Sequence, residues 1–212
     1  MTEDSCPCCG SVTERDSGTD SSTEQWRIDG SVLTTELPDE LGSTLGRLLG
    51  TGPVDTLGGW VAAVRYHTDG SSITTEELCL SDDETEHWGI VDGEKHHFAC
   101  FYDAVILAAL VDSPVAIRTK SPDGTVIEAR AVGTDELTVT PDDAVFSFGI
   151  DKDVSPPSEG GPDLEDGYAA ICPYVKAFSS RDAYEQWTAS VHAPTVDMSL
   201  GGATELAAAL VD

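Results

Sequence analysis

The sequence predicts an α+β fold, in which a small N-terminal helical, winged-helix-like module precedes an antiparallel-hairpin sheet domain with a buried helix. Apolar residues are spaced at helical intervals over much of residues 26–80, and they alternate with polar residues after Pro114. Between these regions, Cys100–Val111 contains no Gly or Pro and is apolar on every face beyond its first turn, which is typical of a buried helix. We therefore expect a disordered, Cys-containing tail over residues 1–25, the helical module over residues 26–95 and an α+β domain with the candidate catalytic residues over residues 96–212.

The charge of the chain limits its setting and its partners. The 212 residues include 39 acidic and 11 basic side chains, giving a net charge of −28 spread along the whole sequence. Such self-repulsion is tolerable where salt screens it, so we expect a salt-rich cytoplasm, as in extreme halophiles. The absence of a basic patch argues against nucleic-acid binding. No apolar run approaches the ~20 residues of a membrane span, and the acidic N-terminus is unlike a signal peptide, so we expect a cytoplasmic protein with reduced thiols.

The module is predicted to consist of three helices and a hairpin. The first helix is flanked by Pro38 and Gly50, the second is weakened by Gly58 and Gly59, and Asp92-Gly93 has the chemistry of a hairpin turn. The expected helices cover residues 37–49, 54–66 and a short stretch that begins with a Thr74–Glu77 capping box and ends near Leu80.

The second half is predicted to contain two hairpins, a mobile loop, a strand and two helices. We expect hairpins of Pro114–Lys120 with Thr125–Val132 and of Glu136–Thr140 with Ala144–Ile150, a loop over residues 151–166, a strand over Tyr168–Phe178, a helix capped by Ser179 and reaching Trp187, and a helix over Leu200–Val211.

Cys100 and Asp103 form the first candidate site. Residues three apart are neighbours on one helix face, so both can meet the same small ligand. A helix that begins near Cys100 would stabilise a thiolate there with its positive end. The alternative is structural, since a buried Cys usually acts as a small hydrophobe and an Asp in the first turn as a dipole partner.

Cys172 is the third candidate, in an apolar stretch directly before Pro173. The alternative here is a buried strand cysteine. The order of Cys100-Phe-Tyr-Asp103, an apolar helix, two hairpins, and Ile171-Cys172-Pro-Tyr-Val-Lys-Ala-Phe-Ser-Ser before a helix resembles the organomercurial lyase (alkylmercury lyase) family over about residues 96–190. The sequence departs from the family pattern at Ala99, Thr119–Ser121, Pro173 and Tyr174.

The resemblance implies roles for the three residues. Cys100 and Cys172 match the two mercury-binding thiols, and Asp103 matches the carboxylate that handles the proton. Thiolate is the soft ligand that suits soft Hg(II), and a buried carboxyl would have the raised pKa that an acid needs at neutral pH. The implied reaction cleaves a carbon–mercury bond by protonolysis to a hydrocarbon and Hg(II), serves mercury detoxification and needs no organic cofactor, with external thiols removing the metal. The rivals are a non-enzymatic Hg/Cu-binding protein or metallochaperone using the same sulfurs, and a protein that keeps the fold without its chemistry.

Two further clusters are candidate metal ligands. Cys6, Cys8 and Cys9 lie in the acidic tail and fit half of a zinc site, a flexible trap for soft metals or an incidental tail. They are also candidates to pass Hg(II) to a mercuric ion reductase. His96 and His97 lie close to Cys100 in sequence, although paired His near a strand end are more often surface residues.

Overall fold

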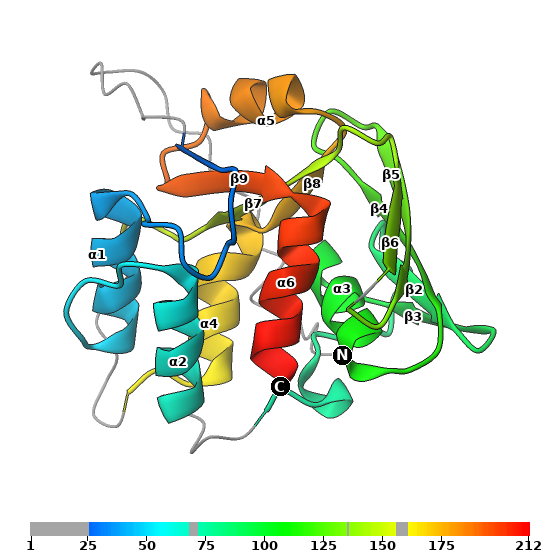
Figure 1. The fold of residues 1–212 in the computed structure, drawn as a ribbon, viewed down its shortest axis with the longest axis horizontal. Helices are drawn as coiled ribbons and strands as arrows, with labels where there is room; N and C mark the ends of the chain where they lie inside the picture. Colours follow the sequence, from blue (N-terminus) through cyan, green and yellow to red (C-terminus); the bar gives the residue numbers. More distant parts are fainter. Residues whose placement is uncertain (1–25, 68–71, 135, 156–160) are drawn as a thin grey trace, which may run out of the picture.

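The computed structural model describes residues 26–67, 72–134, 136–155 and 161–212. Within them the chain forms two β-sheets and a set of helices, which confirms the α+β class (Figure 1). Helices α3 (Phe101–Leu110) and α6 (Leu200–Val211) pack against each other, and each contacts strands of both sheets. The predicted tail, with Cys6, Cys8 and Cys9, lies outside the described residues.

The larger sheet contains the hairpins that turn chemistry predicts. Asp92 and Gly93 adopt positive φ angles of 51° and 85°, which closes the first hairpin, and Gly124 with φ 89° closes the second. The sheet is antiparallel with the order β3-β2-β4-β5-β6, whose strands are β2 (Trp88–Val91), β3 (Glu94–His97), β4 (Val115–Lys120), β5 (Val126–Val132) and β6 (Glu136–Thr140).

The second predicted hairpin is wrong. β6 pairs with β5, whereas the strand after it, β7, joins the other sheet. β6 has alternating exposure, as suits an edge strand with one face in solvent, while four of the five residues of β7 are buried, as suits a central strand covered on both faces. The smaller sheet has the order β1-β9-β7-β8, with β1 (Trp26–Ile28) parallel to β9 (Thr195–Ser199), and β7 (Val145–Gly149) antiparallel to β9 and to β8 (Lys176–Phe178).

Local end signals account for most of the helices. In α1 the acidic residues Asp39 and Glu40 lie in the first turn, and Gly50 ends the helix in the left-handed conformation. Ser199 caps α6 by accepting a hydrogen bond from the Gly202 N–H at 3.2 Å. Besides α3 and α6, the helices are α1 (Asp39–Leu49), α2 (Leu57–His67), α4 (Leu164–Ile171) and α5 (Arg181–Thr188), with the short 3₁₀ turns η2 (Thr75–Glu77) and η3 (Cys172–Tyr174).

Three predictions around Cys172 need correction: a strand, a loop and a helix cap. The expected strand over Tyr168–Phe178 is strand only in β8, and its first half belongs to α4 and η3. The reason is a capping box in which Asp163 and Asp166 exchange hydrogen bonds, which starts a helix inside the expected loop. Ser180 caps α5, since its hydroxyl accepts from the Ala183 N–H, while the hydroxyl of Ser179 donates to Asp123.

Strand pairing crosses the boundary expected between the helical module and the second domain. That boundary, at residue 95, falls inside β3, and β2 is hydrogen-bonded to β4. β1 likewise pairs with β9, near the end of the chain. The hairpin after the three helices is therefore part of the larger sheet, and the division into a tail, a module and a catalytic domain stays a prediction.

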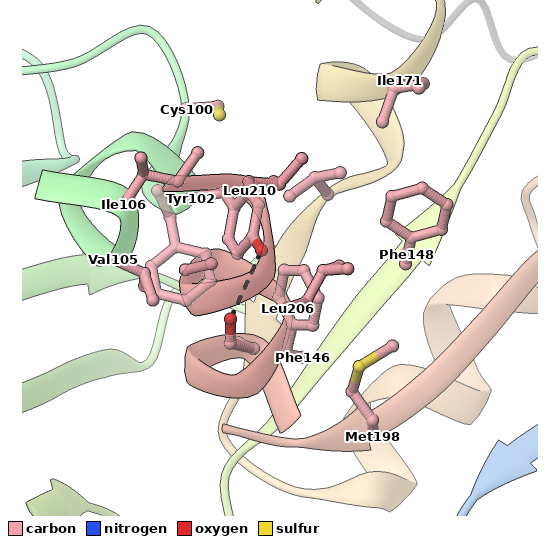
Figure 2. Packing of buried hydrophobic residues seen from close by; sticks show 14 of the residues in the cluster. Cys100, Tyr102, Val105, Ile106, Phe146, Phe148, Ile171, Met198, Leu206 and Leu210 are labelled. Carbon is pink, nitrogen blue, oxygen red and sulfur yellow. Dashed lines mark hydrogen bonds between the residues drawn. The ribbon is translucent and has the colours of Figure 1, made fainter. Parts of the chain in front are cut away.

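The apolar core surrounds α3, as its sequence predicts. Every residue from Phe101 to Ala108 is buried. The ring of Tyr102 stacks on Phe146 of β7 with centroids 5.1 Å apart, and its hydroxyl donates to the Ala203 carbonyl of α6 at 3.3 Å. Figure 2 shows how α3, α6 and β7 meet at this point. α3 is thus fixed between both sheets and α6, and so are the side chains at its first turn.

Candidate active site

The start of α3 brings Cys100 and Asp103 together. Cys100 is the residue before the helix, and Asp103 lies in the first turn. The Cys100 thiol donates a hydrogen bond to Oδ2 of Asp103 at 3.1 Å. The backbone N–H of Cys79 donates to Oδ1 of the same carboxyl at 3.4 Å. Asp103 is therefore held by its own helix turn and by a segment 24 residues earlier.

Cys172 reaches the same place from a segment much later in the sequence. It follows α4 directly and begins η3, where Pro173 occupies an early helical position. Its side chain is in contact with that of Cys100. Cys100, Asp103 and Cys172 expose only 7%, 2% and 8% of their surfaces. The structure thus brings the three predicted side chains, which come from distant segments of the chain, together in one buried place.

These three side chains line one cavity. Its volume is about 510 Å³, and its wall is built by α1, α2, α3, α4, β7, η3 and α6. Apart from the three site residues, the wall is mostly aliphatic and aromatic, and Figure 2 labels several contributors: Tyr102, Ile106, Phe148, Ile171 and Leu210. Asp163 and Glu165, at the start of α4, and His67 add charged or polar groups. Large apolar cavities with a few convergent polar groups are typical of small-molecule sites.

Burial and proximity control the acidity of the site. Contact with Cys172, burial and the nearby Asp103 carboxyl raise the pKa of the Cys100 thiol well above its ordinary value. These effects outweigh the stabilisation of a Cys100 thiolate that we expected from the helix N-terminus. Burial also raises the pKa of Asp103, against hydrogen bonds from Cys100 and Cys79 that lower it. The raised pKa of the carboxyl agrees with the prediction for a buried acid.

Three more residues lie around the site, and the sequence analysis did not single them out. Cys79 supplies the N–H that fixes Asp103. Tyr168 lines the cavity, and its hydroxyl donates to the Glu77 carbonyl at 2.5 Å. Lys176 lies four residues after Cys172; burial lowers the pKa of its ammonium, and electrostatic attraction to the Cys100 and Cys172 sulfurs partly opposes that shift. The sequence signal that could have identified Lys176 is a single cationic residue in the apolar stretch after Cys172.

Other candidates are not part of this arrangement. His97 accepts the Thr85 N–H at 3.0 Å through Nδ1, and neither His96 nor His97 lines the cavity. Among the described residues, no group of three or more His, Cys, Asp and Glu is arranged to hold a metal ion. The Cys6/Cys8/Cys9 cluster lies outside those residues and stays a prediction. The site of Cys100, Cys172 and Asp103 differs from such a three-ligand metal site, because its two thiols suit a soft metal that prefers two sulfur ligands.

An α+β fold with two buried thiols and a carboxylic acid on one apolar cavity defines a thiol-based enzyme for a soft electrophile. Comparison with protein families is more specific: the model of the alkylmercury lyase family matches residues 80–212, well over half of the chain. The chain belongs to the alkylmercury lyase family, and it is an enzyme of that class, which acts on organomercurials.

Comparisons with solved structures and with curated proteins are less specific. A solved structure described as the mercury-bound form of MerB2 is 18% identical to the chain, with a TM-score of 0.48, and the match covers 82% of this chain and 91% of that one. A comparison with curated proteins gave no match. Within the described part of the chain, no helix has the length and apolar character needed to cross a membrane.

Proposed function

We propose that the protein cleaves the carbon–mercury bond of organomercurials by protonolysis, with Cys100 and Cys172 as mercury ligands and Asp103 as the proton-transferring acid. The observation that carries this proposal is the 3.1 Å hydrogen bond from the Cys100 thiol to Asp103, on the wall of a cavity that Cys172 also lines. The family supplies the reaction class, and the geometry supplies a set of residues able to perform it.

The first step exchanges thiols on mercury. A substrate R–Hg–SR′, carried by a small external thiol, meets Cys100, whose S–H already points at a carboxyl oxygen. The Cys100 sulfur forms a bond to mercury, the Hg–SR′ bond breaks, and the Cys100 proton passes through Asp103 to the departing thiolate. This coupling offsets the raised pKa of Cys100, because the proton has an acceptor at the moment the sulfur binds.

The second step breaks the carbon–mercury bond. The Cys172 sulfur, in contact with Cys100, adds to mercury and increases the electron density on the bound carbon. The Cys172 proton is transferred through Asp103 to that carbon as the C–Hg bond breaks, which releases R–H and leaves Hg(II) between the two sulfurs. Burial keeps Asp103 protonated at a higher pH than an exposed carboxyl, which suits a proton donor.

The fate of the product is part of the same proposal. No organic cofactor takes part; external thiols remove Hg(II), and the reaction serves mercury detoxification with a mercuric ion reductase as the final acceptor. The thiols of Cys6, Cys8 and Cys9 are candidates for that transfer.

The test separates a lyase from a soft-metal carrier on the same fold. The parent protein, supplied with methylmercury or phenylmercury and excess small thiol at high salt, is expected to release methane or benzene, measured in the headspace. Asp103→Ala should still bind Hg(II) with both sulfurs but release hydrocarbon at least about 100-fold more slowly. Cys100→Ser should lose both the two-sulfur binding of Hg(II) and the release of hydrocarbon. A parent that binds Hg(II) and yields no hydrocarbon would identify a carrier instead.

A further inference from the structure

We infer that the preferred substrate carries an uncharged apolar organic group of at least ring size, selected by helices α1 and α2. This inference rests on the proposed function and specifies the substrate class of that site. It concerns a part of the chain, residues 39–67, that lies outside the region matched by the family model.

The first argument is the size of the cavity. Its volume of about 510 Å³ far exceeds the space that a methyl group and one mercury atom occupy. An apolar cavity of about 150 Å³ already accepts benzene. A methyl group would leave most of the apolar wall without contacts, whereas a ring would remove a large part of that wall from water.

The second argument is the origin of the wall. α3 and η3 supply the reacting residues, while Leu49 of α1 and Trp60 and Val64 of α2 line the same cavity. The Trp60 ring packs edge-on against Phe148 of β7 with centroids 5.1 Å apart, so an aromatic pair forms part of the lining. Aromatic and aliphatic walls bind an arene by dispersion and edge contacts. The α1–α2 wall is therefore available to contact the organic group and not the metal.

The third argument is charge. Asp163 and Glu165 are the carboxylates that line the cavity besides Asp103, and the chain carries a net charge of −28. An organic group with a carboxylate of its own would be repelled here. The wall thus favours neutral groups such as phenyl over anionic ones.

Val64 allows a direct test, because it is a half-buried wall residue of α2 that touches none of the reacting atoms. Val64→Phe would fill the space meant for the ring. We expect kcat/KM for phenylmercury, divided by kcat/KM for methylmercury, to fall by about fivefold or more, because pocket size discriminates groups by such factors. Comparing this ratio between variant and parent cancels the different intrinsic reactivities of the two substrates. Ala62→Phe adds the same ring to an exposed position of the same helix that does not line the cavity, and it should leave the ratio unchanged.

A second variant covers the case in which Val64→Phe does not fold, which thermal melting would detect. Val64→Ala enlarges the cavity and should raise the rate with naphthylmercury relative to phenylmercury. An unchanged ratio in each folded Val64 variant would overturn the inference while leaving the lyase activity established. A parent that releases neither methane nor benzene would instead refute the proposed function itself.

Discussion

At the scale of single residues, the site places the Cys100 thiol in contact with both an acid and a second thiol, and all three groups are buried. Asp103 accepts from the Cys100 thiol and from the Cys79 backbone, and burial raises its pKa despite both bonds. A carboxyl with a raised pKa in the folded state holds its proton more tightly there than in the unfolded chain. Its contribution to stability is complete below the ordinary carboxyl pKa and is lost as pH rises through the raised value.

This linkage predicts the pH dependence of stability. The free energy of unfolding of the parent, minus that of Asp103→Asn, should decrease as pH rises from the acidic range towards neutrality. Asn keeps the size of the side chain and does not titrate, so it isolates the contribution of the carboxyl. Denaturant unfolding of both proteins at several pH values and constant salt measures the difference; a difference that rises with pH would contradict a raised pKa.

Lys176 gives a second prediction at this scale. Its ammonium would interact favourably with the negative charge that develops on the Cys100 and Cys172 sulfurs as their protons leave, so Lys176→Met should raise the barrier of that step. We expect hydrocarbon release at neutral pH to slow by about threefold to tenfold, as for one partly screened charge. Lys120→Met removes a lysine of β4 that instead pairs with Glu86, and it should keep the parent rate. Identical rates for all three proteins would rule out this role for Lys176.

At the scale of elements, the predictions that succeeded rested on local chemistry. Pro38 and Gly50 bracket α1, and the Asp92-Gly93 turn closes its hairpin, because these residues determine backbone geometry wherever they occur. The i, i+3 spacing likewise identified Cys100 and Asp103 as a pair. The failures involve partners distant in sequence: nothing near Trp26 indicates a parallel pairing with β9, and nothing near Thr140 shows that β6 and β7 separate.

The predicted secondary structure around Cys172 was wrong for a different reason. A short apolar run such as Tyr168–Cys172 is compatible with a strand or a buried helix, and the Asp163–Asp166 capping box that decides between them was hidden in an expected loop. The contact between Cys172 and Cys100 could be predicted only from the resemblance to the family. The cavity could not be predicted, because its wall combines segments from α1 to α6 that tertiary packing alone brings together.

The adjacent glycines of α2 predict opposite effects on stability. A Cβ on Gly58 would lie 2.5 Å from the Leu33 carbonyl oxygen, which is backbone and cannot move aside easily. A Cβ on the exposed Gly59 would meet only ordinary contacts at 3.5 Å and beyond. Gly58→Ala should therefore lower the free energy of unfolding by about 1–3 kcal/mol, and Gly59→Ala should raise it by about 0.5–1 kcal/mol. Denaturant unfolding of both variants measures this contrast, and a stabilised Gly58→Ala would show that α2 can move away from Leu33.

At the scale of the whole molecule, the dominant physical feature is the net charge of −28. Ion pairs relieve little of the resulting repulsion. Those formed by Arg27, Arg118, Lys120 and Lys152 are all at least partly exposed, although Arg181 pairs with the buried carboxylate of Asp197. Like charges on a compact fold repel one another more than in the expanded unfolded chain, and dissolved salt weakens that repulsion.

We therefore expect the melting temperature to rise as KCl increases from about 0.01 M to 1 M, over which the screening length falls from about 30 Å to 3 Å. A melting temperature measured with sucrose at equal osmolality controls for exclusion of solutes from the protein surface. No change with KCl would mean that repulsion contributes little to the stability of this fold. A steady further rise well beyond 1 M would indicate effects other than screening.

The contact between Cys100 and the Asp103 carboxyl also bears on how the enzyme withstands air. Peroxides and alkylating reagents attack cysteine as the thiolate, and the first oxidation product, a sulfenic acid, forms slowly from a buried thiol that keeps its proton. Mercury compounds need no preformed anion here, because the adjacent carboxyl accepts the proton as the metal binds. The contact with Cys172 and the burial that hold the proton on Cys100 would thus slow its attack by common oxidants, while the proposed reaction with mercury keeps its own route for that proton.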